Sequence, residues 1–362
     1  MQNPTSSTNT NKNTLSGVIK LGIDVHASTY VVVMKVDSST PSRAKKMTPE
    51  KFMAWVSQLR KDCDELHSCY EAGPFGYGLH RKLLALGIQN CVIRPINWST
   101  HGQKVKTDAR DAYQMVLALD GYLRGNDRSF TVVRVPTEAE ERKRSLVRLR
   151  QSFVKERGRS AKRGLSLGLY YDRPIPSGWW RPLKWAKLLE ELDEFMIGLL
   201  EPLRASCEHF DRLLKDIEMK MSELEPVREL PKGMGIVLSE QIEREICDWS
   251  RFENRKQISS YTGLCPSEDT SANRRFQGSI NKHGNRRLRH MLVECVWLLI
   301  RWNPGYVGIT KWQSQLDAAK ATKASRKKIV VAIARQFAVD WWRVRTGQVI
   351  PESLGLLMKS VR

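Results

Sequence analysis

Three features are scarce or absent in this 362-residue sequence. The seven cysteines form no Cys-x-x-Cys pair and no zinc-spaced cluster, so they are expected to be buried thiols of a reducing cytosol. No apolar run approaches the roughly 20 residues that a membrane-spanning helix needs, which argues against a membrane protein. Acidic residues are few, since 39 Asp and Glu stand against 60 Lys and Arg, a formal net charge of +21.

This basic surplus predicts a polyanionic partner, with nucleic acid as the leading class. The hydrophobic content of 41% is enough to bury real cores, and the length predicts two or three domains. Residues 1–16 are polar and contain no apolar segment, so we expect a disordered tail there rather than a signal peptide. We expect the protein to be cytoplasmic and nucleoid-associated, in a bacterium or archaeon.

Residues 17–135 show a mixed α/β pattern of apolar strands and amphipathic helices. The expected elements are, in order, strands at 18–25 and 30–36, a helix capped by Thr48, a strand ending before Gly73, a helix closed by Gly87, a strand ending before Pro95, and a helix from Asp108. This order predicts a domain built around a sheet.

The segment "KTDARDA" places two carboxylates three residues apart at the start of an apolar helical pattern. Asp108 and Asp111 share a helix face with the apolar stripe at 112–119, so we expect both to point inward. Two buried like charges require neutralisation, and a divalent cation supplies it. The alternative is that Asp108 caps the helix and Asp111 is a first-turn acid favoured by the helix dipole.

Two further acids follow strands. Asp24 ends the first strand and Glu71 ends the strand before Gly73. If these strands are parallel neighbours, their carboxyl ends place Asp24 and Glu71 together, within reach of the helix from Asp108. Four converging carboxylates predict two Mg²⁺ ions about 3.5–4 Å apart, a centre that cleaves phosphodiesters.

A strongly basic helix follows at residues 142–163, with ten Lys and Arg and one acid, Glu156. Such a run is often a solvated face, but this asymmetry favours contact with nucleic-acid phosphates. The candidate contacts are Arg142, Lys143, Arg144 and Arg148.

Residues 183–226 carry apolar residues near coiled-coil spacing, interrupted by Pro202, which must kink the run or start a second helix. We expect a dimerisation arm, and the alternative is an amphipathic hairpin packed on its own core. Gly233 and Gly235 then precede a helix near Ile236 and resemble a phosphate-gripping helix-hairpin-helix loop.

Residues 266–292 show no regular apolar pattern before Leu288 and are expected to form a basic loop. Ser271 could act there as a phosphoryl-transfer nucleophile, with Arg274 and Arg275 neutralising charge on the phosphorus. The alternative is that Ser271 belongs to an ordinary polar loop and has no catalytic role. Further candidate nucleic-acid contacts are Lys282, Arg286 and Arg287.

Several motifs resemble those of IS110-family insertion-sequence transposases, the DEDD-type recombinases guided by a bridge RNA. "GIDVH", "YEAGPFGYGLHRKL" and "KTDARDA" resemble the family's RuvC-like catalytic domain. "LPKGMG", "RFENRKQISSYTGLCPSEDTS" and "GSINKHGNRRLRHMLVECVW" resemble its C-terminal transposase domain. The resemblance spans residues 17 to about 347.

The resemblance implies an α/β RNase H-like (RuvC-like) domain, a helical or coiled-coil arm and a mostly α-helical C-terminal domain. It makes Asp24, Glu71, Asp108 and Asp111 the metal-binding acids. It also makes Ser271 the serine that forms a phosphoserine link to DNA, although Ala272 stands where the family has glycine. Thr270 and Ser279 are alternative hydroxyls. The implied partners are element-end and target DNA, a structured guide RNA and further copies of the chain in a homo-oligomer.

The expected domain boundaries follow from these motifs. They are a tail at 1–16, the catalytic domain at 17–135, the basic helix and arm at 136–228, the serine-carrying domain at 229–347 and a tail at 348–362. Two other functions stay open: a metal-dependent RuvC-like nuclease in which Ser271 is structural, and a non-catalytic nucleic-acid binder whose acids only cap strands and helices.

Overall fold

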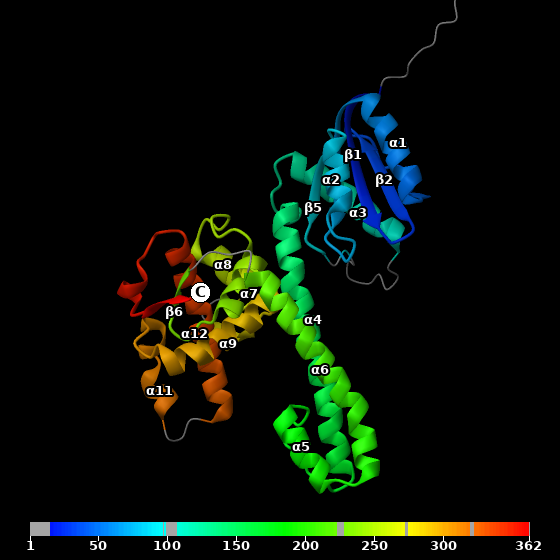
Figure 1. Ribbon diagram of the computed structural model, residues 1–362. Helices are drawn as coiled ribbons and strands as arrows, with labels where there is room; N and C mark the ends of the chain where they lie inside the picture. The colour runs from blue at the N-terminus through cyan, green and yellow to red at the C-terminus, as the bar shows by residue number, and fades with distance from the viewer. Residues whose placement is uncertain are drawn as a thin grey trace, which may run out of the picture. The chain divides into compact units, whose positions relative to one another are not determined.

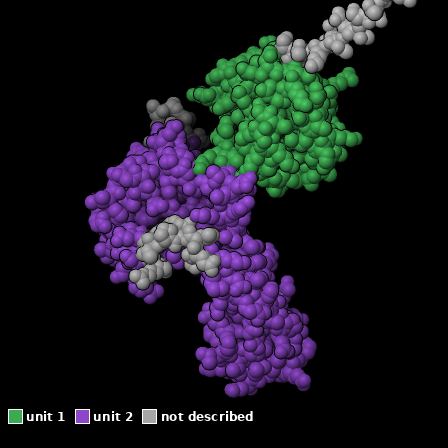
Figure 2. All heavy atoms as spheres, turned by 45° about the horizontal axis from the view of Figure 1, so that its top comes forward, with its two compact units in different colours: residues 1–135 green, residues 136–362 purple. Residues whose placement is uncertain are grey.

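The computed structural model divides the chain into two units, residues 1–135 and 136–362 (Figure 2). It describes residues 15–96, 98, 107–222, 228–271, 274–318 and 322–361. The expected tail at 1–16 therefore lies outside the described residues except for its last two, where the first strand has already begun. Among the described residues, no helix is long and apolar enough to cross a membrane.

The first unit is a mixed α/β fold, as the sequence predicted. Its elements are β1 (Leu15–Val25), β2 (Tyr30–Val36), β3 (Lys45–Met47), α1 (Pro49–Lys61), β4 (Cys63–Glu71), α2 (Gly78–Ala85), β5 (Gln89–Ile93) and α3 (Asp108–Leu123). The strand order is β3-β2-β1-β4-β5. β1 pairs antiparallel with β2 and parallel with β4, and β4 pairs parallel with β5.

Helices cover both faces of this sheet (Figure 1). Alternation along β1 turns Ile19, Leu21 and Ile23 toward the face covered by α1 and α2, where all three are fully buried. Each such side chain contributes about 2 kcal/mol of hydrophobic stabilisation. The opposite face of the sheet packs against the buried stripe of α3, as expected for residues 112–119.

α3 lies directly on β1 because Gly22 has no side chain. A Cβ atom at Gly22 would come within 2.2 Å of the Ala112 carbonyl oxygen and 2.6 Å of the Val116 nitrogen. The same face of β1 carries the buried Lys20, whose Nζ lies 2.6 Å from Oδ1 of Asp120 near the C-terminal end of α3. Lys35 on β2 contacts the other Asp120 oxygen at 3.3 Å. These contacts fix the position of the helix along the strand.

The second unit begins with long helices and ends with a smaller helical core. Its first elements are α4 (Glu138–Tyr170), α5 (Pro182–Glu191), α6 (Glu194–Ser222), β6 (Arg228–Pro231), α7 (Ile236–Ile246) and α8 (Arg255–Thr262). The remaining elements are β7 (Pro266–Ser271), β8 (Arg274–Ile280), α9 (Arg286–Trp302), α10 (Val307–Thr310), α11 (Gln313–Asp317), α12 (Lys323–Arg345), the 3-10 helix η1 (Pro351–Leu354) and β9 (Met358–Val361). One apolar core joins α7, α8, α9 and α12.

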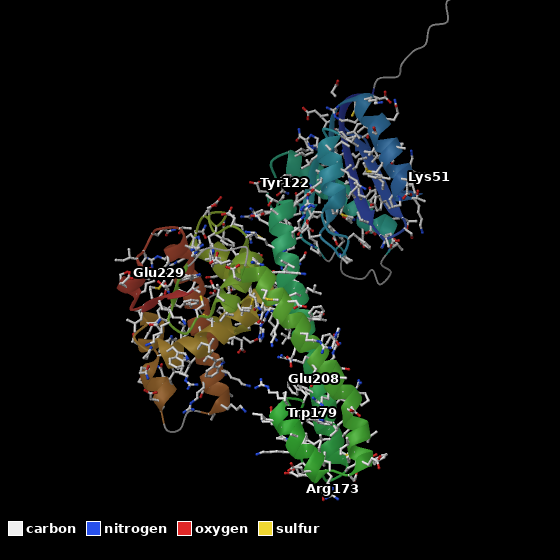
Figure 3. The ribbon with its side chains drawn as sticks, in the orientation of Figure 1. Lys51, Tyr122, Arg173, Trp179, Glu208 and Glu229 are labelled. Atoms are coloured by element: carbon white, nitrogen blue, oxygen red, sulfur yellow. The ribbon has the colours of Figure 1, made fainter. Side chains whose placement is uncertain are left out.

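The apolar residues expected to form a coiled coil pack within the chain itself, where α6 lies against α4. Pro202 was expected to kink the run or to start a second helix, and the second alternative was wrong, because α6 continues through Pro202. Packing against α4 offsets the lost hydrogen bond. Ile217 and Met221 of α6 contact Val147 of α4. The buried Trp179 donates its indole N–H to the Ala161 carbonyl of α4 at 3.0 Å (Figure 3).

Two expectations about the C-terminal region were wrong. Residues 266–271 and 274–280 form the paired strands β7 and β8 instead of a loop, and they gave no apolar signal because their described side chains do not bury one face. Residues 348–362 were expected to be a tail, but they hold η1 and β9, and β9 pairs antiparallel with β6. The buried Asn303 joins the ends of these strands, since its Oδ1 accepts a hydrogen bond from Leu357 N at 3.0 Å.

Candidate metal centre and nucleic-acid interface

Asp24 and Asp108 approach each other from a strand end and a helix start. Asp24 follows Ile23 on β1, so alternation turns its side chain toward the face that α3 covers. α3 begins at Asp108, and its N-cap is Thr107, whose side chain accepts a hydrogen bond from Arg110 N. The hypothesis that Asp108 itself caps the helix was therefore wrong, and the Asp108 carboxylate is free of that task.

His26 completes a group of three potential ligands with these two aspartates. Its Nε2 lies 3.3 Å from Oδ2 of Asp24 and 3.5 Å from Oδ2 of Asp108. One ligand atom from each of the three residues lies within 4.8 Å of the others. The two carboxylates and the imidazole are the donor types that divalent cations bind in proteins. The residues present therefore fit a metal ion.

The electrostatics of Asp24 also fit a cation. Partial burial raises the pKa of Asp24, and the neighbouring Asp108 and Asp111 raise it further, while His26 lowers it only in part. The carboxylate is thus less stable in its charged form than an ordinary aspartate. A divalent cation would relieve the repulsion among the acids.

The expectation that both aspartates of α3 point into the core was wrong for Asp108. Its side chain is 53% exposed, and Asp111 is only half-buried, whereas Ala112, the residue after Asp111, is fully buried. The first turn of α3 lies at the rim of the sheet, where the inward stripe meets solvent. The acids therefore line an accessible site.

Glu71 lies at the predicted strand end but outside the three-ligand group. β1 and β4 are parallel neighbours with Ile23 beside Tyr70, so Asp24 and Glu71 follow at adjacent strand ends, as expected. Oε1 of Glu71 accepts hydrogen bonds from Ile96 N at 3.2 Å and from the Trp98 indole at 2.7 Å. These contacts hold the Glu71 carboxylate in place at the end of β4, beside the end of β1 that carries Asp24.

Sequence reasoning missed His26. The motif "GIDVH" contains it two residues after Asp24, but a lone histidine in a turn has no periodic signal. Its proximity to Asp108 depends on how α3 packs on β1. The sequence signal that could have identified His26 as a candidate ligand is a carboxylate at a strand end followed two residues later by a histidine in a tight turn.

Ser271 is the last residue of β7 and pairs in register with Arg274 of β8. Thr270 pairs likewise with Arg275. The side chains of these four residues, and all of Ala272, lie outside what the structure describes. Ser279, the other alternative hydroxyl, lies in β8, and its carbonyl accepts a hydrogen bond from the Ser267 hydroxyl at 3.1 Å.

Three predicted nucleic-acid contacts are exposed around the start of α9. Arg286 and Arg287 are its first two residues, and Lys282 lies in the preceding loop with a positive φ of 59°. Asn285 caps the helix, since its Oδ1 accepts hydrogen bonds from Arg287 N and Leu288 N. An exposed basic helix start is well suited to phosphate contact.

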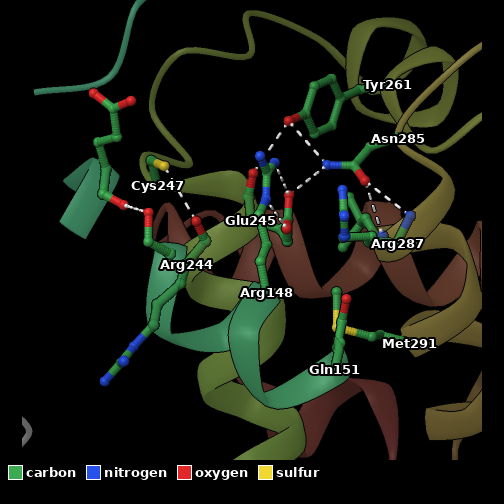
Figure 4. Close-up of polar contacts among 12 residues, drawn as sticks. Arg148, Gln151, Arg244, Glu245, Cys247, Tyr261, Asn285, Arg287 and Met291 are labelled. Atoms are coloured by element: carbon green, nitrogen blue, oxygen red, sulfur yellow. Dashed lines mark hydrogen bonds and ion pairs between the residues drawn. The ribbon is translucent and has the colours of Figure 1, made fainter. Parts of the chain in front are cut away.

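Arg148 has a structural role that the sequence did not predict (Figure 4). Its Nε and Nη2 bond both carboxylate oxygens of Glu245 on α7, at 2.9 and 3.0 Å. The Glu245 side chain is fully buried and also accepts a hydrogen bond from Asn285 Nδ2 at 3.0 Å. Burial alone would raise the pKa of Glu245, but the bonds from Arg148 and Asn285 hold it below its ordinary value.

The other predicted contacts of α4 lie near its N-terminal end. Arg142 is 84% exposed and lies 3.7 Å from Glu138. Lys143 is half-buried, and Arg144 contributes to lowering the pKa of Glu245. Further along α4, Arg150 and Arg157 form ion pairs with Glu218 and Asp211 of α6. Much of the basic run therefore stabilises packing within the second unit.

Two known families match parts of the chain. The family described as "Transposase IS116/IS110/IS902 family" matches residues 227–308. The DEDD transposase family of the IS110 type, described as "Transposase", matches residues 21–167. Together these ranges contain the three-ligand group and the start of α9.

Three curated relatives align over most of the chain. "Putative transposase y4rJ" of Sinorhizobium fredii is 29% identical over 323 residues, which cover 80% of this chain and 79% of the relative. "Putative transposase y4qE" of the same organism is 29% identical, over 67% of this chain and 60% of the relative. The "Transposase for insertion sequence element IS1533" of Leptospira borgpetersenii is 26% identical, over 77% and 84%.

Asp24→Asn should remove metal binding while stabilising the metal-free protein. The pKa of Asp24 is raised in the folded state, so above that pKa its charge disfavours folding, and removing the charge relieves this penalty. In EDTA the variant should melt above wild type, and its Mn²⁺ affinity by titration calorimetry should fall at least about tenfold.

Asp127→Asn is the matched control. Asp127 is exposed and follows the C-terminal end of the 16-residue α3, roughly 24 Å of helix from Asp108. Its affinity for Mn²⁺ should equal that of wild type. Unchanged Mn²⁺ affinity in Asp24→Asn would contradict the assignment of this carboxylate as a ligand.

Arg148→Ala should destabilise the second unit, because it leaves the buried Glu245 carboxylate without its cation. The expected loss is about 3 kcal/mol in the free energy of unfolding, measured by urea denaturation with tryptophan fluorescence. Arg142→Ala, on the exposed face of the same helix, should change it by less than about 0.5 kcal/mol. A stable Arg148→Ala protein with weakened nucleic-acid binding would instead make Arg148 a direct contact.

Proposed function

We propose that the chain is a transposase of the IS110/IS116 family, as the two family matches within it support, and that it cuts and rejoins DNA strands during excision and insertion of a mobile element. The observation that carries this proposal is the convergence of Asp24, Asp108 and His26 at the carboxyl end of β1. Ligands gather at that edge in open α/β sheets. The acids belong to the range that the DEDD transposase family matches.

The catalytic fold in this proposal is RNase H-like, of the RuvC type. Support comes from a five-stranded mixed sheet in the order β3-β2-β1-β4-β5, with the antiparallel strands first and the parallel strands after them. α3 carries its acids to the end of the central strand. In this proposal the second unit supplies an arm and the serine-carrying domain.

The metal-binding acids in this proposal are Asp24, Glu71, Asp108 and Asp111, and the expected cofactor is a pair of Mg²⁺ ions. Bound divalent cations would polarise the scissile phosphate and neutralise charge that develops on it. Asp24 and Asp108 orient their carboxylates toward a common point from two rigid elements. Glu71 is held by Ile96 N and the Trp98 indole, which keeps one oxygen in a fixed position.

The nucleophile in this proposal is Ser271. Its hydroxyl oxygen attacks phosphorus, an Oγ–P bond forms as a P–O bond of the DNA strand breaks, and the serine proton passes to the released DNA oxygen, which becomes a hydroxyl. Attack by a hydroxyl of another strand reverses the step, so the bond energy is conserved without an external source. Ser271 is the last residue of β7 and pairs in register with Arg274 of β8, which supports a role for this arginine beside the attacked phosphate.

The partners in this proposal are element-end and target DNA, a structured guide RNA and further copies of the chain. Lys282, Arg286 and Arg287 support nucleic-acid contact because they are exposed around the start of a helix that has no acid in its first turn. Arg142 is the best candidate on α4 because it is the most exposed of the four named there.

The decisive experiment follows labelled element-end DNA on a denaturing gel with purified protein, Mg²⁺ and the cognate RNA. Wild type should give a covalent protein–DNA adduct. Ser271→Ala should lose the adduct because no Oγ is present, and Asp111→Asn should lose it because the acid cluster is incomplete. Rates should fall by at least about 10³-fold.

Ser279→Ala is the matched control, since Ser279 lies in the same hairpin, and it should keep the adduct. Free cleaved ends that persist in Ser271→Ala would identify a metal-dependent nuclease without serine chemistry. Nucleic-acid binding without cleavage in wild type, unaffected by Asp111→Asn, would identify a non-catalytic binder.

A further inference from the structure

The turn after β1 presents an imidazole to the metal centre in a fixed position. His26 begins this turn, and its backbone N–H donates to the Thr29 carbonyl at 3.0 Å. The strands on either side are paired, with Val25 opposite Tyr30 and Asp24 opposite Val31. The short hairpin therefore leaves the backbone of His26, two residues after Asp24, little freedom to move.

The spacing of the three donors suits coordination better than simple ion pairing. Nε2 of His26 lies 3.3 and 3.5 Å from oxygens of Asp24 and Asp108, beyond the 2.7–2.9 Å of a strong charged hydrogen bond. A single N–H would have to be shared between the two oxygens, which weakens its bond to each. In an octahedral site with bonds of about 2.1 Å, neighbouring ligand atoms lie about 3.0 Å apart and opposite ones about 4.2 Å.

All three donors lie within 4.8 Å of one another, close to that range, and small side-chain rotations would bring them onto one ion. His26 is 45% exposed and Asp108 is 53% exposed, so neither needs a core rearrangement to do this. A neutral imidazole also adds a ligand without adding to the negative charge of Asp24, Asp108 and Asp111.

We propose that His26 is a nitrogen ligand of the ion held by Asp24 and Asp108, and that this position selects first-row transition-metal ions over Mg²⁺. Imidazole binds such ions more strongly than it binds Mg²⁺, which prefers oxygen ligands and retains water. This inference rests on the metal centre of the proposed function.

The test uses Mn²⁺ as a paramagnetic probe on the full-length protein without nucleic acid. Electron spin echo modulation should show coupling to an imidazole ¹⁴N in wild type. His26→Ala should lose this coupling, and its Mn²⁺ affinity should fall at least about tenfold. Its Mg²⁺ affinity, measured by competition, should change less than about threefold because Mg²⁺ gains little from the imidazole.

His26→Asn guards against a disturbed turn, since asparagine is favoured in turns and offers an oxygen ligand. It should fold like wild type and bind Mn²⁺ without ¹⁴N coupling. His290→Ala, an exposed histidine of α9 in the second unit, is the matched control and should keep the coupling.

The outcomes separate this inference from the proposed function. Mn²⁺ that binds wild type without imidazole coupling, and with unchanged affinity in His26→Ala, would overturn the role of His26 and leave the carboxylate centre standing. Failure of wild type to bind any Mn²⁺ or Mg²⁺ would overturn both. Imidazole coupling in wild type that is lost in His26→Ala together with Mn²⁺ selectivity, and a covalent adduct formed by wild type in Mg²⁺, would support both.

Discussion

The direct contact between β1 and α3 is the constraint on which the candidate site depends. Gly22 allows the backbone of α3 to lie against the strand, because any side chain there would overlap Ala112 and Val116. The contact sets the height of the helix over the sheet, and the ion pair between Lys20 and Asp120 sets its position along the strand. The start of α3 then falls at the end of β1, where the ligands of the proposed metal centre meet. The positions of the ligands therefore depend on this packing and not on the ligand residues alone.

Asp120 and Asp24, which lie near opposite ends of α3, have pKa values shifted in opposite directions. At the C-terminal end, burial would raise the pKa of Asp120, but Lys20 and Lys35 hold it below its ordinary value, so its charge is balanced within the chain. At the N-terminal end, burial and two neighbouring acids raise the pKa of Asp24. The first set stabilises the fold at neutral pH. The second leaves negative charge that a cation can balance, which is what a catalytic centre requires.

Sequence patterns predicted β1, β2, β4 and β5, the helices α1, α2 and α3 of the first unit and the adjacency of Asp24 and Glu71, because alternation, caps and turn residues are local signals. They could not predict contacts that depend on packing. Arg148 looked like its exposed neighbours until Glu245, distant in sequence, was placed against it. The β7–β8 hairpin lacked an apolar period, and His26 acquired its partner only through α3. The family comparisons support the transposase assignment, and the roles of Ser271 and of a guide RNA are proposals.

The most direct test of this account is the Mn²⁺ affinity of Gly22→Ala, measured on the full-length protein by titration calorimetry. The substituted methyl group would push α3 away from β1 and separate Asp108 from Asp24 and His26, although Gly22 is no ligand. We expect the affinity to fall at least about tenfold. Gly78→Ala, where a Cβ atom meets nothing within 4 Å, should leave it unchanged. A folded Gly22→Ala protein with wild-type Mn²⁺ affinity would contradict the claim that this contact assembles the site.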